Sequence, residues 1–204
     1  MTGAAGVTSG GPAGPGRAVE LARQRDELRA LAGALASCPP VVHERTASEM
    51  RERLALTAAL RRSFVGHETV KLLRVWPVLR RHDPGAVPLI AESVQLKKRA
   101  EELMVKLGWA GERDESINDD TAALLGLVEE VLRIEEGLVA QLEVLVPADE
   151  LARLQRRLHR GLRWSPTRAH PELPSGFRSA RLLAPLVGVV DRLRDLCAPR
   201  VAPT

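Results

Sequence analysis

The chain has 204 residues, of which 45% are hydrophobic and 27% are charged, and its formal net charge is +4. This length is enough for one domain, or for one domain with extensions. Aromatic residues make up only 2% and Tyr is absent, so Leu, Ala and Val must build the core, which favours helices over a β-sandwich. The net charge is too small to indicate a nucleic-acid partner unless the basic residues cluster.

The cysteines and the N-terminus exclude several classes of protein. Cys38 and Cys197 are the only cysteines, which excludes a disulfide framework and any C-x-x-C site for zinc or redox chemistry. No apolar run approaches the roughly 18–20 residues of a membrane span. The first residues have neither the basic start nor the apolar core of a signal peptide. We therefore expect a cytoplasmic protein without membrane association.

The chain divides into four regions. Residues 1–16 are half Gly and Pro and are predicted to form a disordered tail. Residues 17–164 are predicted to form a helical bundle with a fifth helix, followed by a Pro-rich connector at 165–177 and a C-terminal amphipathic helix and tail at 178–204. The expected helices of the second region span about 17–37, 46–82, 88–107, 121–146 and 148–164.

Apolar residues recur at helical spacing in each of these segments. The stripe of the second helix consists of Leu56, Leu60, Phe64, His67, Lys71, Val75 and Val78, so His67 and Lys71 are expected to point toward the core. Four amphipathic helices of about 20 residues with short connections predict an all-α, antiparallel up-down four-helix bundle.

The stretch "SFVGHETVKLLRVWPVLRRH", Ser63 to His82, contains one histidine placed for metal binding. A histidine followed four residues later by an acid is a common metal-binding arrangement on a helix, because both side chains lie on one face. Here the residue four after His67 is Lys71, whose charge would repel a metal ion.

Several segments together resemble the hemerythrin-type HHE cation-binding domains of bacteria. They are His67 with "WPVL", Glu130 with "LVAQL", "PADELARLQRRL" and "SPTRAHPELP". The "PTR-x-HP" connector and the "LVGVVDRLRDL" tail resemble the actinomycete branch in particular. The resemblance covers roughly residues 18–197. It implies an antiparallel four-helix bundle that holds two non-haem irons and serves oxygen, nitric oxide or redox-linked roles.

The family's ligands are one His on each of the first and third helices and His-x-x-x-Glu on each of the second and fourth. Carried over residue by residue, only His67 matches, ten residues before Pro77. The other five positions hold residues that do not fit the pattern: Arg25, Lys71, Lys97, Glu130 and Ile134. The resemblance therefore implies a divergent member whose diiron site is lost.

Two interpretations of His67 remain open at this point. It is either a structural histidine of the core or the centre of a rearranged metal site with Glu101, Glu102, Glu130 or Glu135. For the substituted positions we expect an ionic cluster around His67, with Glu130 bridging two of the cations Arg25, Lys71 and Lys97. The alternative is that these long side chains reach out to water. The same acids can also lie on the solvated face, paired with Lys97, Lys98, Arg99 or Arg133.

The fifth helix carries arginines opposite its leucines: Arg153, Arg156, Arg157, Arg160 and Arg163. They form either an anion-binding patch or the solvated face of a docked helix, and the absence of interleaved aromatics argues against nucleic acid. No hydrolytic, P-loop or dinucleotide motif is present. We expect a non-enzymatic structural or interaction module with no cofactor and an unidentified protein partner. The alternative is an HHE protein that binds non-haem iron at a rearranged site around His67.

Overall fold

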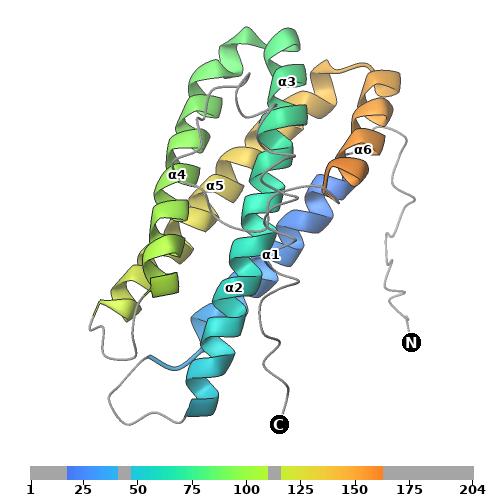
Figure 1. Ribbon diagram of the computed structural model, residues 1–204. Helices are drawn as coiled ribbons and strands as arrows, with labels where there is room; N and C mark the ends of the chain where they lie inside the picture. The colour runs from blue at the N-terminus through green and yellow to red at the C-terminus, as the bar shows by residue number, and fades with distance from the viewer. Residues whose placement is uncertain (1–17, 41–46, 110–115, 163–204) are drawn as a thin grey trace, which may run out of the picture.

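The computed structural model describes residues 18–40, 47–109 and 116–162, and all regular structure within these ranges is helical (Figure 1). The elements are α1 (Val19–Ser37), α2 (Ala47–Val70), the π-helix η1 (Lys71–Val75), α3 (Trp76–His82), the 3₁₀ turn η2 (Pro84–Ala86), α4 (Val87–Trp109), α5 (Ile117–Leu145) and α6 (Ala148–Leu162). The all-α prediction is confirmed for these residues. The predicted tail, the connector, the C-terminal helix, Arg163 and Cys197 lie outside them.

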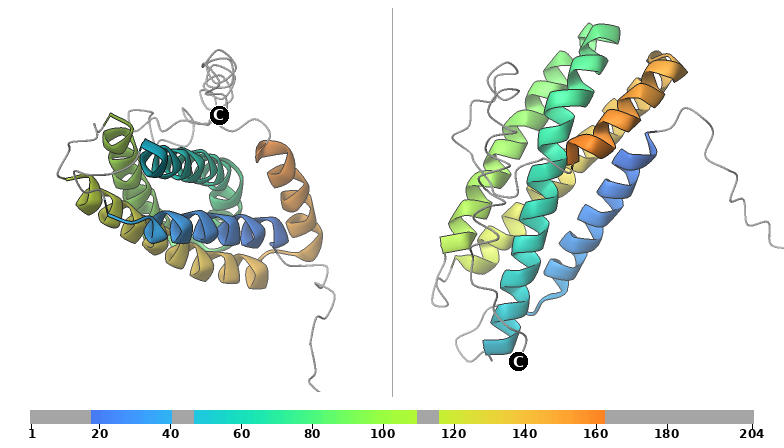
Figure 2. Two further views of the ribbon diagram at one scale, coloured as in Figure 1. Left: turned by 90° about the horizontal axis from the view of Figure 1, so that it is seen from below. Right: turned by 45° about the vertical axis from the view of Figure 1, so that its right-hand side comes forward.

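The four long helices lie side by side and successive ones run in opposite directions (Figures 1 and 2). Helix α1 packs on α2, α2 on α4, α4 on α5 and α5 on α1, so these contacts close a ring. Helix α6 packs against α1, α2 and η1, at the end of the ring where α1 begins. None of the described helices is both long and apolar enough to cross a membrane.

The second predicted helix is interrupted shortly before Pro77, the residue at which the sequence allows a kink in its last turn. The backbone widens into a π-helix at Lys71–Val75, in which the Trp76 N–H donates to the carbonyl of Lys71. Pro77 lies two residues after the end of this turn, and a proline both lacks an N–H and crowds the carbonyl four residues earlier. That carbonyl belongs to Leu73, inside the wide turn, where the hydrogen-bond pattern has already changed. The stripe from Leu60 to Val78 nevertheless stays buried, as expected.

Helix α5 begins earlier than the pattern predicted. Its first residue is Ile117, so Asp120 lies in the first turn rather than at the cap position before the helix. A carboxylate in the first turn is favourable because the helix dipole is positive there. Asp120 Oδ2 also lies 2.6 Å from the Lys106 ammonium. This ion pair connects the start of α5 to the end of α4.

The interior consists of two apolar clusters, one toward each end of the ring. The cluster near α6 is built around Trp76, Leu79, Leu138 and Leu142, with the α6 leucines Leu151, Leu154 and Leu158 packed on it. The cluster at the other end contains Leu60, Phe64, Met104, Leu124 and Leu132. Buried polar residues lie close to the points where α1, the run of α2 and η1, and α5 pass from one cluster to the other: Gln24, His67, Glu68, Lys71 and Glu135.

Replacing Phe64 with Ala is expected to lower the free energy of unfolding by about 3–5 kcal/mol, because its fully buried ring would leave a cavity. Urea denaturation followed by circular dichroism measures the loss. Val144→Ala is the control, since Val144 is 83% exposed and its truncation should change stability by less than about 0.5 kcal/mol. Equal effects of the two substitutions would contradict this placement of the core.

Candidate functional site: a buried ionic cluster

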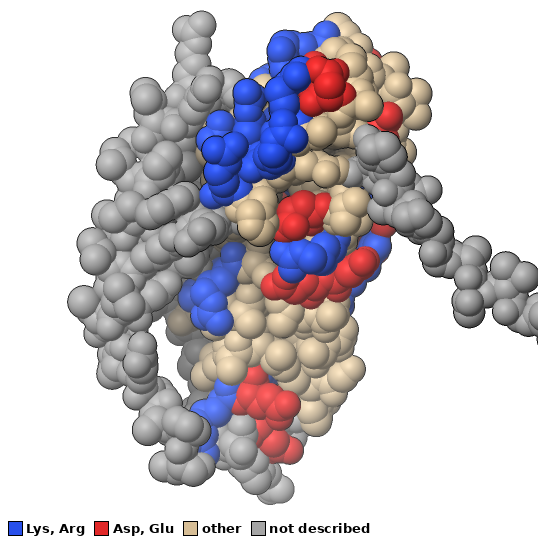
Figure 3. Space-filling model, turned by 90° about the vertical axis from the view of Figure 1, so that its right-hand side faces the viewer, with Lys and Arg blue, Asp and Glu red and all other residues tan. Residues whose placement is uncertain are grey.

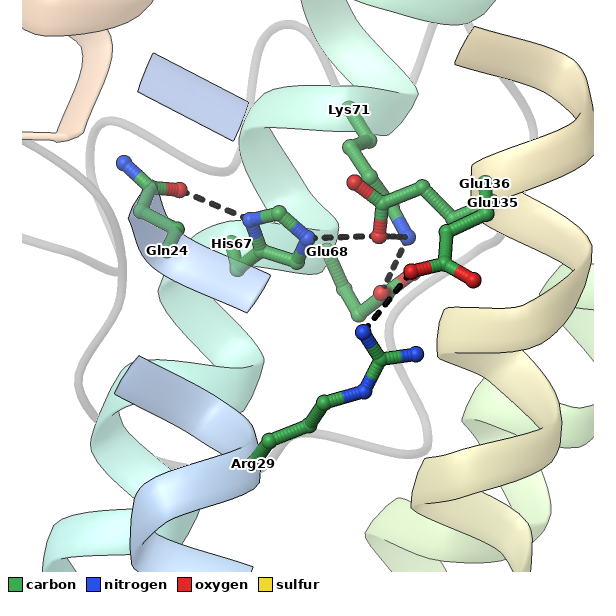
Figure 4. A network of polar contacts seen from close by, with 7 residues as sticks. All are labelled: Gln24, Arg29, His67, Glu68, Lys71, Glu135 and Glu136. Atoms are coloured by element: carbon green, nitrogen blue, oxygen red, sulfur yellow. Dashed lines mark hydrogen bonds and ion pairs between the residues drawn. The ribbon is translucent and has the colours of Figure 1, made fainter. Parts of the chain in front are cut away.

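Four ionisable side chains meet in the interior between α2, η1 and α5 (Figure 4). His67 and Glu68 come from the last turn of α2, Lys71 is the first residue of η1, and Glu135 lies in the middle of α5. Each is at most 2% exposed. Because residues three and four apart share a helical face, His67, Glu68 and Lys71 reach the same side of their helix.

Lys71 links the two carboxylates of the cluster. Its Nζ donates to Glu135 Oε2 at 2.9 Å and lies 2.5 Å from Glu68 Oε1, an ion pair without the alignment of a hydrogen bond. The same ammonium lies over the ring of Trp76, 5.3 Å from its centroid, within the range of a cation–π contact. Lys71 is thus surrounded by two anions and an aromatic face.

The charges of this cluster stabilise one another. Burial by itself would lower the pKa of the Lys71 ammonium, but the negative charges of Glu135 and Glu68 outweigh this, so the pKa lies above its ordinary value of 10.5. Burial would likewise raise the pKa of the Glu135 carboxyl. The positive charges of Lys71 and His67 and their hydrogen bonds instead hold that pKa at about 2, below the ordinary 4.5. Lys71 and Glu135 are therefore both charged at neutral pH.

The contacts of His67 hold its ring on both sides. Its Nε2 lies 2.7 Å from Glu135 Oε2, and its Nδ1 lies 2.7 Å from Gln24 Oε1. Gln24 has its oxygen toward the ring because its Nε2 donates to Glu20 Oε1 at 2.9 Å. An amide oxygen accepts hydrogen bonds. The ring is therefore positioned between α1 and α5.

The Lys71 ammonium and the His67 ring thus face the carboxylates of Glu68 and Glu135. Buried charges are tolerated in a low-dielectric interior when they are paired in this way. Two carboxylate oxygens of the cluster have no hydrogen-bond partner among the described residues: Glu68 Oε1, which forms the ion pair with Lys71, and Glu135 Oε1.

The structure corrects the predicted composition of the cluster. An ionic cluster around His67 is present and contains Lys71, but Arg25 is only half-buried. Glu130 does not bridge two cations; it pairs with Arg133 on the surface at 2.6 Å. Lys97 pairs with Glu101 on its own helix at 2.6 Å. Ile134 is an apolar core residue.

Glu135 takes the role that was expected of Glu130. Of the four acids proposed to complete a rearranged site, Glu101 pairs with Lys97 and Glu102 is exposed, while Glu135 binds His67. Gln24 and Glu68 were missed. Gln24 and Glu135 each lie one residue from a position taken from the resemblance, Arg25 and Ile134. Adjacent side chains on a helix point in directions about 100° apart. An alignment error of one residue therefore moves a side chain from the interior of the bundle to its edge.

The arginines of α6 lie on its exposed face, opposite the buried leucines: Arg153, Arg156, Arg157 and Arg160. Figure 3 shows the side of the molecule that carries α6, where basic side chains gather at one end with acidic side chains beside them. Arg153 pairs with Asp149 of its own helix at 2.6 Å, and Glu150 binds Arg81 at 2.9 Å. The solvated-face interpretation accounts for these local pairs, and an anionic partner stays a prediction.

Comparison with known proteins does not supply a family for this fold and cluster. The chain matches no family model, no curated protein and no solved structure. The argument for function therefore starts from the cluster itself, whose imidazole and carboxylates are of the kinds that bind metals in proteins.

Replacing Glu135 with Gln is expected to destabilise the protein by about 3–5 kcal/mol, because the Lys71 ammonium would keep its charge in a dry interior with one carboxylate fewer. The adjacent Glu136 offers a matched control. It pairs with Arg29 at 2.7 Å on the surface (Figure 4), so Glu136→Gln should cost less than about 1 kcal/mol. Chemical denaturation at pH 7 measures both, and a Glu135→Gln variant as stable as the wild type would contradict the ionic cluster.

The contribution of Glu135 to stability should depend on pH in the acid range. Its folded pKa of about 2 lies below the ordinary 4.5, so the stabilisation is complete above pH 4.5 and is lost as the pH falls toward 2. The difference between these pKa values corresponds to about 3 kcal/mol. Denaturation of the wild type and Glu135→Gln between pH 7 and pH 2 should show the gap between them narrowing by this amount below pH 4.5. A gap that stays constant with pH would contradict the lowered pKa.

Proposed function

We propose that the chain is a hemerythrin-like, antiparallel up-down four-helix bundle that has lost the diiron centre and acts as a non-enzymatic structural or interaction module. The ring of contacts among α1, α2, α4 and α5 supports the bundle. The buried His67, ten residues before Pro77, supports the resemblance. The module needs no cofactor, and its partner would be another protein rather than nucleic acid.

One observation supports the proposed loss of the metal: the Lys71 ammonium lies among the side chains that would bind a metal ion. Lys71 Nζ contacts Glu135 Oε2 at 2.9 Å and Glu68 Oε1 at 2.5 Å. It thus supplies the positive charge that an ion would bring. A second cation placed beside it would be repelled strongly in a low-dielectric interior.

The donor set also does not fit two irons. Among the described residues, the group that could hold an ion consists of three side chains, His67, Glu68 and Glu135, each with one ligand atom within 4.8 Å of the others. Three ligands around a fixed ammonium are too few for a dinuclear site built on the family's pattern of six. The family's iron chemistry is therefore not assigned to this chain.

The second candidate function is binding of one cation at the rearranged site. The same three ligand atoms favour it, because imidazole and carboxylate together suit divalent transition metals. It requires Lys71 to leave its two carboxylates. The metal content of the native protein separates the two candidates.

The purified chain, loaded anaerobically with ferrous iron and then desalted, is expected to retain less than about 0.1 iron per chain and to show no diiron absorption after exposure to oxygen. Treatment with a chelator should leave its melting temperature unchanged, since no ligand stabilises the folded state. One equivalent of bound iron would favour the second candidate. Two equivalents would overturn the proposed loss of the diiron centre.

A further inference from the structure

The ammonium of Lys71 lies beside three side chains that could bind a metal ion. His67 Nε2, Glu135 Oε2 and Glu68 Oε1 are buried together and turned toward one small region, and Lys71 Nζ lies within 2.9 Å of both carboxylate oxygens. Glu135 also has the buried oxygen Oε1 without a hydrogen-bond partner among the described residues. One imidazole nitrogen and two carboxylate oxygens together could hold a small cation. The ammonium of Lys71 lies among them instead.

We propose that His67, Glu68 and Glu135 form a latent site for a single divalent transition-metal ion, which the Lys71 ammonium occupies in place of the metal. Shortening Lys71 opens the site. The inference rests on the proposed function, in which the native chain is free of metal, and adds the reason for that property.

The charges support this exchange. The Lys71 ammonium lies between Glu68 and Glu135 and supplies positive charge to both carboxylates. A divalent ion bound to the same oxygens would supply that charge instead, so the buried carboxylates would keep a positive partner.

The chemistry of the donors indicates the class of ion. One imidazole nitrogen and two carboxylates suit Zn²⁺, Fe²⁺ or Mn²⁺. Gln24 is already placed to orient the ring, since it accepts from Nδ1 at 2.7 Å and so leaves Nε2 as the metal-binding nitrogen. Of the three ligands only His67 occupies a position carried over from the family's six-ligand pattern, so the site differs from the diiron centre in its two carboxylates and in its number of ions.

The proposal is tested with the full-length chain, in which Lys71 is replaced by Ala and Zn²⁺ is added. Wild type is expected to bind no zinc at 100 µM, by calorimetry and by metal analysis after desalting. Lys71→Ala should bind about one zinc per chain, and its melting temperature should rise by about 5 °C at a zinc concentration 100-fold above Kd. The double variant Lys71→Ala, Glu135→Gln should lose this binding by at least tenfold.

Lys97→Ala is the matched control. Lys97 pairs with the buried Glu101 at 2.6 Å, so its removal also takes a lysine away from a buried carboxylate, yet Glu101 is not in the group that could hold an ion. This variant should gain no zinc binding. A gain equal to that of Lys71→Ala would show that removing a lysine from any buried carboxylate is sufficient, which would overturn the proposed site.

The remaining outcomes separate the inference from the proposed function. Zinc binding by wild type at one equivalent would overturn both. A folded Lys71→Ala variant that binds no zinc would overturn the latent site alone and leave the metal-free module standing. If Lys71→Ala folds only when zinc is present, the site is supported, and if it stays unfolded with and without zinc, the site is overturned.

Discussion

The ammonium of Lys71 has no access to water, and its charge is stable there because Glu135 and Glu68 lie within 2.9 Å. This pairing connects the middle of α5 to the junction of α2 and η1. The neighbouring His67 shares Glu135 and extends the connection to α1 through Gln24. Three helices thus meet at one polar layer between two apolar clusters. Removing one partner would leave a charge that the surrounding side chains cannot solvate.

Periodicity was sufficient to predict the helices and the inward direction of His67 and Lys71. The stripe of the second helix has several large apolar members, and together they define its buried face. The position of Glu135 could not be predicted in the same way. Three consecutive residues of α5 range from core to surface: Ile134, Glu135 and Glu136. An alignment to a motif can be wrong by one residue, and it then assigns the buried position to the wrong side chain. Only packing against α2 resolves that choice.

The π-helix is the second feature that the sequence left open. Pro77 indicated a disturbance of the helix, but a proline is accommodated by a kink, a break or a wide turn. The choice depends on what surrounds it. Here Val75 and Trp76 are buried in the cluster that α6 covers, so the wide turn keeps both sides of the helix in contact with the core. A kink would have pulled one of them away from α6.

The hydrogen bond between Gln24 and His67 also determines how α1 aligns with its neighbours. Apart from the exposed Val19, the apolar residues of α1 are leucines and alanines, which pack nearly as well after a small slide or rotation of the helix. A shift of one residue would turn Arg23 or Arg25 toward His67 in place of Gln24, and an arginine has no acceptor for the ring N–H. Buried polar contacts can specify alignment in this way even when they add little stability. The polar layer therefore selects one arrangement of the first helix from several that hydrophobic packing alone would allow.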